Sequence, residues 1–244
     1  STAGFLFYET QEGFNFRSVD NLIEQSPFSK DYSYTPGVVK NDDPNKDFKI
    51  LKYNIDRNQD LLGKLRRGAY SSERYYINPV SFKPDIRHFK SSDYMGQDGI
   101  NNLGEEQIVL PSISDDDSKS LGDAPTRIFV GMLDVGTIEK TTTDKGWNDP
   151  AERNADPAKS QAQAAMRYNQ LLSQIVEITI PLNTNLFAGS IIRCIFPSID
   201  REKKKSPDAQ SSGLYMISEL AHYFDGKGSY TKLKLLRDSS GRKW

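Results

Sequence analysis

Two histidines are the first side chains to consider for chemistry, because imidazole serves both as a general base and as a metal ligand. His88 and His222 lie far apart in the sequence, and neither has a second His, Cys or Glu at a spacing typical of a metal site. A general base at His222 would also need an orienting carboxylate and a nucleophile, and the sequence has no G-x-S-x-G motif to supply one. We therefore interpret both histidines as surface or packing side chains and predict no metal site.

Acidic side chains form two further clusters. Asp115–Asp117 begins a polar run that lacks the alternating oxygen ligands, central glycine and terminal Glu of a calcium loop, so we interpret it as a solvated loop. Glu105 and Glu106 would supply half of a glycosidase pair only if a partner carboxylate lay about 5–10 Å away in a cleft. We predict no catalytic residue and no cofactor, and a cell-wall glycan hydrolase remains the alternative.

Two groups of basic side chains are better suited to contact another protein. The run 66–70 lies at the end of a predicted helix, where arginine opposes the helix dipole, and Arg and Tyr commonly anchor interfaces. The run 201–205 lacks the interleaved aromatics that stack on single-stranded nucleic acid, so it is either a solvated loop or a contact for an acidic neighbour. The candidate interface residues are Arg66, Arg67, Tyr70, Arg201, Lys203 and Lys204.

Composition limits the classes of protein to which this chain can belong. Its 244 residues suffice for a sizeable core in one or two domains, and 12 Tyr and 12 Phe suit β structure. A net charge of −1 gives no overall attraction to nucleic acid or to an anionic membrane, so we expect no stable binding to either. Cys194 is the only cysteine, which excludes an internal disulfide and favours a small buried side chain.

The C-terminal third gives the clearest structural pattern. Apolar residues alternate with polar ones in its first segment, which is the period of a half-buried strand. Its last two segments flank Asp225-Gly226-Lys227-Gly228, a turn sequence that predicts a β-hairpin. The predicted strands are Val176–Ile180, Ile191–Phe196, Leu214–Tyr223 and Ser229–Arg237.

The rest of the chain predicts further strands and three helices. The N-terminal segments Phe5–Thr10 and Phe14–Arg17 predict a hairpin, and Ser18 is a candidate N-cap for a short helix. Residues 28–46 have the composition of a loop. The remaining predicted strands are Phe48–Ile55, Ser71–Asn78, Ser81–Phe89 (with an edge position or a bulge because of Pro84) and one within Thr126–Thr137. The other predicted helices are Asn58–Arg67 and Ala158–Gln174, the second capped by Asp156 with Pro157 at its first position.

The order of these segments resembles a known family, the central baseplate hub subunit of contractile-tailed, T-even-like bacteriophages. The resemblance covers most of the chain and rests on fold signatures, not catalytic motifs. The family subunit is longer and begins with a tube-forming β-barrel, and this sequence resembles the part that follows. The segments that carry the resemblance are 13–23, 65–72 with 75–79, Arg167-Tyr168-Asn169 with 176–180 and 191–197, and 213–224 with 228–233.

The resemblance implies a fold and a division into domains. The fold class is mainly β with minor α (α+β), with an antiparallel β-barrel interrupted by an insertion. Residues 1–46 would be the end of a preceding domain plus a linker. Residues 47–90 and 167–238 would form the discontinuous barrel, and residues 91–166 the insertion.

The resemblance also implies a structural function. Three copies, each with two similar barrels in the full family subunit, would form a ring that fits a hexameric tail tube on one side and a trimeric spike on the other. The implied partners are the chain itself as a homotrimer, the spike protein and the tail tube protein. The implied location is the virion tail baseplate, with assembly in the host cytoplasm. A soluble glycan- or peptide-binding β module is a further alternative.

Overall fold

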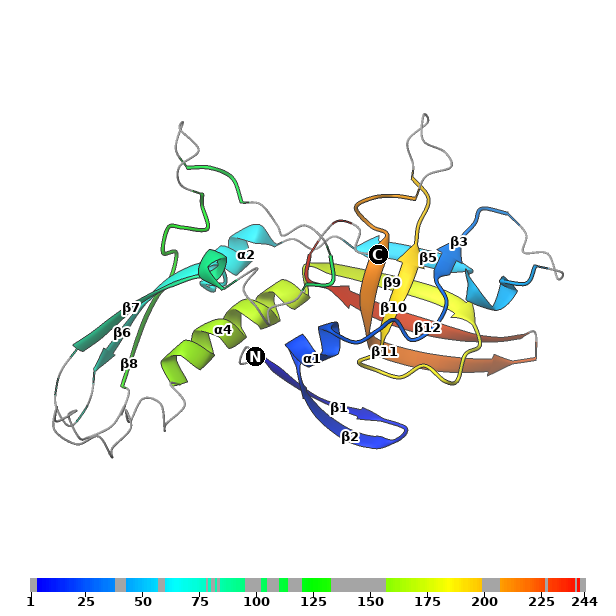
Figure 1. The fold of residues 1–244 in the computed structure, drawn as a ribbon, viewed down its shortest axis with the longest axis horizontal. Coiled ribbons are helices and arrows are strands. Elements are labelled where there is room, and N and C mark those ends of the chain that lie inside the picture. The colour runs from blue at the N-terminus through cyan, green and yellow to red at the C-terminus, as the bar shows by residue number, and fades with distance from the viewer. Residues whose placement is uncertain are drawn as a thin grey trace. The chain divides into compact units, whose positions relative to one another are not determined.

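The computed structural model describes residues 4–37, 43–56, 60–77, 79, 82, 84–94, 102–104, 110–113, 120–132, 157–198, 207–226, 228–239 and 241. The chain forms two compact units (Figure 1). One unit contains the described residues of 60–100 and 110–169, and we call it the insertion unit. The other contains those of 5–59, 101–109 and 170–244, and we call it the sheet unit. The domain boundaries implied by the family resemblance stay a prediction.

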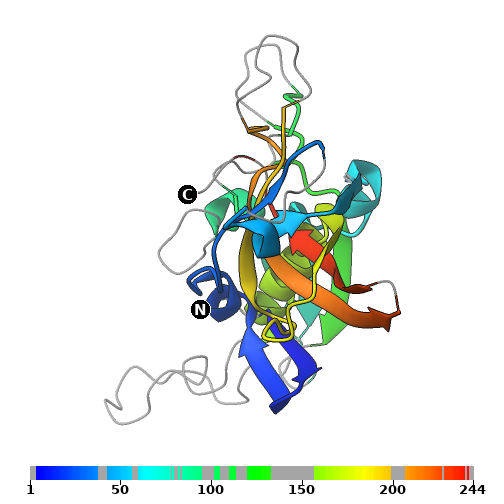
Figure 2. The same cartoon turned by 90° about the vertical axis from the view of Figure 1, so that its right-hand side faces the viewer.

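A seven-stranded sheet forms most of the sheet unit (Figures 1 and 2). Its strands follow the order β4-β3-β10-β11-β12-β9-β5, and the β11–β12 and β12–β9 ladders are the longest. Gly228 lies at the start of β12 with a φ of 154°, so the tight hairpin turn between β11 and β12 is made where glycine is favoured. The strands are β3 (Tyr32–Tyr34), β4 (Lys49–Ile50), β5 (Lys52–Asp56), β9 (Gln174–Pro181), β10 (Ile191–Ile195), β11 (Gly213–Asp225) and β12 (Gly228–Arg237).

The sheet is mixed, which corrects the expectation of a purely antiparallel barrel. Strand β3 runs parallel to both β10 and β4, whereas the remaining ladders of this sheet are antiparallel. The sheet is curled into a half barrel. Its two terminal strands are consecutive in the chain, because Leu51 alone separates β4 from β5 and donates its N–H to the carbonyl of Thr179 at 2.8 Å. The prediction of a mainly β fold is confirmed.

The concave side of this curled sheet holds the main hydrophobic core. Alternate residues of β9 and β12 point inward, as their sequence period predicts, and meet aromatic side chains from β3, β5 and β11. Tyr53 lies against Phe196 and Tyr34, with ring centroids 5.0 and 4.7 Å apart. Cys194 is fully buried here, as predicted, and burial raises the pKa of its thiol. The buried residues of this core include Tyr32, Ile50, Val176, Ile178, Ile180, Ile192, Tyr215, Ile217, Leu233 and Leu235.

The convex side of the same sheet is apolar at one end only, where other elements cover it. Helix α1 (Val19–Ile23) and the hairpin of β1 (Phe5–Thr10) and β2 (Gly13–Ser18) pack there (Figure 1). Ser18 caps α1 as predicted, because its Oγ accepts the N–H of Asn21 at 3.2 Å. Residues of this second core are Leu6, Tyr8, Val19, Leu22, Ile23, Leu103, Leu171, Ile175, Ile191, Leu214, Met216 and Leu236.

The insertion unit contains a three-stranded sheet with the order β7-β6-β8. Its central strand β6 (Ser71–Ile77) pairs antiparallel with β7 (Pro84–Lys90) and parallel with β8 (Ile128–Met132). Pro84 begins β7, an edge strand as predicted. Helix α4 (Pro157–Leu171) begins at its predicted proline and supplies Ala162 and Met166 to a cluster with Phe89. Helix α2 (Leu61–Arg66) supplies Leu61 and Leu65 to a second cluster with Tyr70.

Most elements agree with the sequence prediction, and the exceptions have local causes. Helix α2 begins at Leu61 and not at residue 58, because Asp60 is its N-cap and accepts the N–H of Gly63 at 3.1 Å. The predicted strand Phe48–Ile55 is divided at Leu51, where the chain changes partner from β3 to β9. Strand β3 lies within a segment predicted as loop. Asp156 lies outside the described residues.

Candidate assembly surfaces

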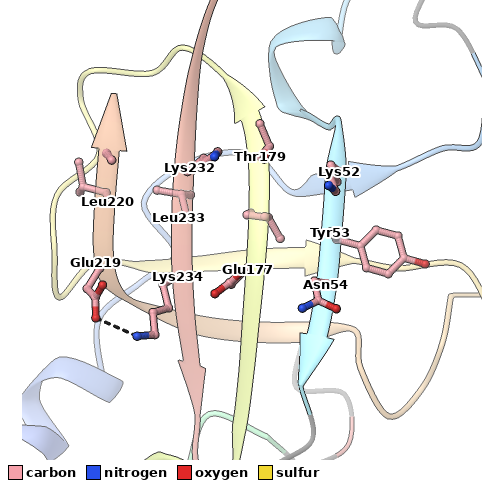
Figure 3. A pocket seen from close by; sticks show the side chains of 12 residues that line it. Lys52, Tyr53, Asn54, Glu177, Thr179, Glu219, Leu220, Lys232, Leu233 and Lys234 are labelled. Carbon is pink, nitrogen blue, oxygen red and sulfur yellow. Dashed lines mark hydrogen bonds and ion pairs between the residues drawn. The ribbon is translucent and has the colours of Figure 1, made fainter. Parts of the chain in front are cut away.

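The uncovered part of the convex sheet face carries charged and polar side chains in two rows (Figure 3). The strand register places Lys52, Thr179 and Lys232 side by side across β5, β9 and β12. The next row crosses the same strands and adds β11, and Lys234 there donates to Glu219 Oε1 at 3.0 Å. Its members are Asn54, Glu177, Lys234 and Glu219. The rows line a depression of ≈ 390 Å³, and we call this surface the charged face.

Aromatic side chains continue the charged face toward the turn of the β11–β12 hairpin. Tyr223 and Tyr230 are register partners, and their rings stack with centroids 5.0 Å apart. The ammonium of Lys232 lies 4.9 Å from the ring centroid of Tyr223, a favourable cation–π distance. This surface therefore offers ammonium groups, carboxylates and phenol rings to a polar partner or to water.

The β1–β2 hairpin carries a second surface, made of four phenylalanines. The antiparallel register places Phe7 opposite Phe16, and the alternation of strand side chains puts Phe5 and Phe14 on the same face. The rings form two stacked pairs, Phe5 with Phe16 at 5.2 Å and Phe7 with Phe14 at 5.7 Å. Phe7, Phe14 and Phe16 are 69–72% exposed and Phe5 is 42% exposed. We call this surface the Phe face.

The three-stranded sheet of the insertion unit has one covered face and one exposed apolar face. Arg74 lies on the covered face, where its guanidinium contacts the hydroxyls of Ser72 and Tyr76 and lies 4.4 Å from the ring centroid of Phe129. The opposite side chains are aligned in rows across the three strands. We call this opposite side the aliphatic face; its exposed apolar members are Ile77 (43%), Ile86 (52%), Ile128 (60%), Val130 (74%) and Met132 (82%), and Glu73 and His88 lie on the same side.

The predicted interface residues near α2 have different surroundings. Arg66 is exposed. Arg67 is bound within the insertion unit, because its guanidinium contacts Asp60 Oδ2 at 2.9 Å and Asn169 Oδ1 at 3.1 Å. Tyr70 is buried in the α2 cluster, and this burial raises the pKa of its hydroxyl. Arg201, Lys203 and Lys204 lie outside the described residues. Their role as interface residues stays a prediction.

The ionisable groups considered first for chemistry do not converge in the described part of the chain. His88 has a 66% exposed side chain with its Nδ1 at 3.9 Å from Glu73, and His222 Nδ1 lies 2.9 Å from the hydroxyl of Thr231. Glu105, Glu106 and Asp115–Asp117 lie outside the described residues. Over the described ranges, no group of three or more His, Cys, Asp or Glu side chains is arranged to hold a metal ion. Over these ranges, too, no helix is long and apolar enough to cross a membrane.

One strongly perturbed group lies at the end of the concave core. Tyr215 donates its hydroxyl to the carbonyl of Ser211, and burial raises its pKa to about 12. The guanidinium of the fully buried Arg237 lies 5.2 Å from the ring centroid of Tyr215 and donates to the carbonyls of Gln210 and Ser212 at 3.2 Å. These contacts join the last strand to the loop before β11, so this cluster stabilises the fold.

Sequence reasoning missed the Phe face and the aliphatic face as surfaces. Their alternating apolar residues were correctly predicted as strands, but alternation does not show whether the apolar side meets the chain's own core. One signal was present in the hairpin. The second strand carries Phe14 and Phe16, and in the first strand Phe5 and Phe7 alternate with Leu6 and Tyr8. Both faces of β1 are therefore apolar, although a two-stranded hairpin on a core covers only one.

Comparison with known proteins gives one significant curated relative. No protein-family model matches the chain. A probable baseplate hub protein, gp334, of Vibrio phage KVP40 is 21% identical over 246 aligned residues, which cover 97% of this chain and 53% of the relative. This match confirms the resemblance to baseplate hub proteins. The chain spans about half the length of the curated relative it matches.

Comparison with solved structures gives two tail proteins at low sequence identity. The tail protein from Neisseria meningitidis MC58 is 11% identical, with a TM-score of 0.45, over 98% of this chain and 52% of that one. The 43 kDa tail protein of prophage MuSo2 from Shewanella oneidensis is 10% identical, with a TM-score of 0.41, over 96% of this chain and 51% of that one.

Proposed function

We propose that this chain is a structural building block of a phage tail baseplate hub, in which three copies form a ring between the tail tube and the central spike. The observation that carries the proposal is the match to a probable baseplate hub protein along 97% of the chain. Its place would be the virion tail, after assembly in the host cytoplasm. In this role the chain acts through its surfaces and needs no catalytic residue.

The sheet unit supports this proposal through the way in which its two sides differ. The concave side is filled by a continuous apolar core, which makes the curled sheet a rigid body. The convex side is covered by α1 and the β1–β2 hairpin at one end and is charged at the other. A rigid body with a polar exposed face suits a ring whose inner or outer wall meets water or polar partners.

The insertion unit supports the same proposal because it leaves a large apolar surface exposed. Contiguous exposed apolar patches of several hundred Å² commonly mark sites of protein association. The aliphatic face and the Phe face both have this character, because their exposed apolar side chains are neighbours in the strand register. A chain with two such surfaces is expected to have at least one protein partner.

Light scattering and electron microscopy of the purified chain test this function. We expect a particle of three times the 27.6 kDa chain mass, seen in images as a ring with a central opening. The ring should co-sediment with the tube and spike proteins of the same phage and not with an unrelated tube protein. A chain that remains monomeric at high concentration, and binds neither protein, would contradict the proposal. Cell-wall clearing abolished by Glu105→Gln would favour a hydrolase instead.

A further inference from the structure

The chain exposes three surfaces that differ in charge, and this difference decides which of them can meet a second copy. The charged face carries Lys52, Lys232 and Lys234 beside Glu177 and Glu219, so a contact there would take charged groups of both copies out of water. The Phe face carries Glu9, and the aliphatic face carries Glu73, His88 and Lys90 beside its exposed apolar side chains. From these we propose that the Phe face of one copy docks on the aliphatic face of the next copy.

The contact would bury an apolar area close to that of a specific protein interface. An aromatic side chain buries roughly 150–250 Å² when it is covered, so the four phenylalanines at their observed exposures present about 500 Å². Five side chains of the aliphatic face are 43–82% exposed and present a comparable apolar surface. Covering both would remove about 1,000 Å², which is the lower bound for a specific protein interface. Either face alone is too small to bind firmly to a polar surface.

The two faces also suit each other in shape and chemistry. Both are faces of short β-sheets, and stacked sheets pack about 10 Å apart with interdigitating side chains. Aromatic rings on one side meet branched and flexible aliphatic side chains on the other. Met132 is the most exposed of these at 82%, and a thioether makes favourable contacts with phenylalanine rings.

The positions of the charges also favour the pairing of two different faces. Glu9 is the register partner of Phe14 and is exposed on the Phe face, so two Phe faces brought together would bring two carboxylates together. The aliphatic face has Lys90 at one end of β7, with a 42% exposed side chain 3.7 Å from Asp123. It also carries Glu73, whose carboxylate accepts the hydroxyl of Tyr75 at 2.9 Å. Two Phe faces would set Glu9 only against a second carboxylate, whereas the aliphatic face offers Glu9 a cation at Lys90.

The pairing of two different faces also determines the type of assembly. A contact between two different surfaces of identical chains is heterologous, and it produces a closed ring when the rotation between copies closes. A contact between two identical surfaces stops at a pair. The proposed contact therefore rests on the proposed ring and deepens it, because it names the two surfaces by which consecutive copies would join.

Two single substitutions and their mixture test this contact. Phe7→Glu damages only the Phe face, and Val130→Glu damages only the aliphatic face; both positions are about 70% exposed, so each variant should melt within a few degrees of the parent. In sedimentation velocity we expect the parent chain to assemble and each variant alone to sediment as a 27.6 kDa monomer. An equimolar mixture should form pairs and no ring, because one copy keeps an intact aliphatic face and the other an intact Phe face.

A matched control uses Phe224, which is 71% exposed beside the β11–β12 turn and belongs to neither face. Phe224→Glu should assemble like the parent. If the parent assembles and Val130→Glu or Phe7→Glu does so equally well, the proposed contact is wrong although the ring proposal stands. Variants that pair on their own would mean that a face binds its own copy, which also overturns the contact. A monomeric parent would overturn the contact, and a monomeric parent that also binds neither the tube protein nor the spike protein would overturn both proposals.

Discussion

The seven-stranded and three-stranded sheets differ in the polarity of their exposed outward faces. On β12, the outward residue Leu236 is apolar where α1 and the hairpin cover the sheet, and Lys234 and Lys232 follow where that cover ends. On β8 the outward residues Ile128, Val130 and Met132 are all apolar, yet each is at least 60% exposed. In the seven-stranded sheet, the outward side chains of β12 are apolar where other elements cover them and charged where they are uncovered. In the three-stranded sheet, the outward side chains of β8 are apolar although they are exposed.

This contrast between the two sheets indicates how a surface that binds another molecule can be recognised. Scattered exposed apolar residues are ordinary on protein surfaces, so an exposed Leu or Ile alone means little. The informative observation is a strand that keeps its apolar alternation where the described part of its own chain leaves those side chains exposed. The aliphatic face and the Phe face meet this criterion, whereas the charged face does not.

The largest effect should follow from truncating the concave core of the seven-stranded sheet. Leu235 is fully buried, and Leu235→Ala should lower the free energy of unfolding by about 2–5 kcal/mol, because it removes apolar contacts and leaves a cavity. Val130→Ala, measured on dilute monomer, should change it by less than about 0.5 kcal/mol. Urea unfolding of both variants measures this contrast. Equal losses would show that the aliphatic face is covered within a single chain, and the comparison would fail.

Alkaline pH should affect the same core. Burial raises the pKa of Tyr215 to about 12, so between pH 10 and 12 the unfolded chain loses this proton and the folded chain keeps it. Stability is therefore lost as pH rises through this window, by on the order of 2–3 kcal/mol. Urea midpoints at pH 8 and pH 11.5 measure the loss. Tyr215→Phe should be less stable at pH 8 but should lose less between these two values; an unchanged pH dependence would contradict the assignment.

The cover of the seven-stranded sheet can be disturbed at a single glycine. Gly189 has a φ of +85°, and a Cβ there would lie 2.6 Å from the hydroxyl oxygen of Tyr8, on the inner side of the β1–β2 hairpin. Gly189→Ala should therefore cost about 1–2 kcal/mol through backbone strain and hairpin displacement. Thermal melts measure the cost, and hydrogen exchange of β1 amides reports the displacement. Gly226→Ala, with open space around the new methyl group, is the matched control.

The smallest effect is expected on the charged face. The ion pair between Lys234 and Glu219 joins side chains that are 38% and 68% exposed, and such exposed pairs contribute about 0.2–1 kcal/mol. A double-mutant cycle with Lys234→Ala and Glu219→Ala should give a coupling energy near the lower end of this range of about 0.2–1 kcal/mol. The coupling energy should be smaller in 1 M salt, which screens exposed charges. A coupling well above 1 kcal/mol would mean that this face is shielded from water.

The sequence was most informative where local pattern and tertiary environment agree. Val176, Ile178 and Ile180 alternate with polar residues, and the β11–β12 turn is glycine-containing, so both ladders follow from local signals. Ser18 was recognised as a cap for the same reason. These predictions needed no knowledge of distant parts of the chain.

The failures depend on contacts between distant segments. Tyr32–Tyr34 becomes strand β3 only because β10 and β4, far along the chain, flank it in parallel, and three residues carry no readable period. Local sequence did not predict that a carboxylate seven positions away and an amide on α4 hold the guanidinium of Arg67, whose role at an interface stays a prediction. The strands that carry the Phe face and the aliphatic face were predicted correctly. Their exposure was not, because exposure depends on the folded chain and local alternation does not indicate it.

The junction at Leu51 gives the seven-stranded sheet an unusual response to thermal opening. In an open sheet, a terminal strand can fray and leave the opposite edge intact. Here the two ends of the sheet belong to one short segment, Lys49–Asp56, so detaching that segment breaks hydrogen bonds to β3 and β9 in a single event. Amide protons on either side of the seam should then exchange with solvent at a shared rate, and the weakest point of the sheet would be one peptide segment and not an edge.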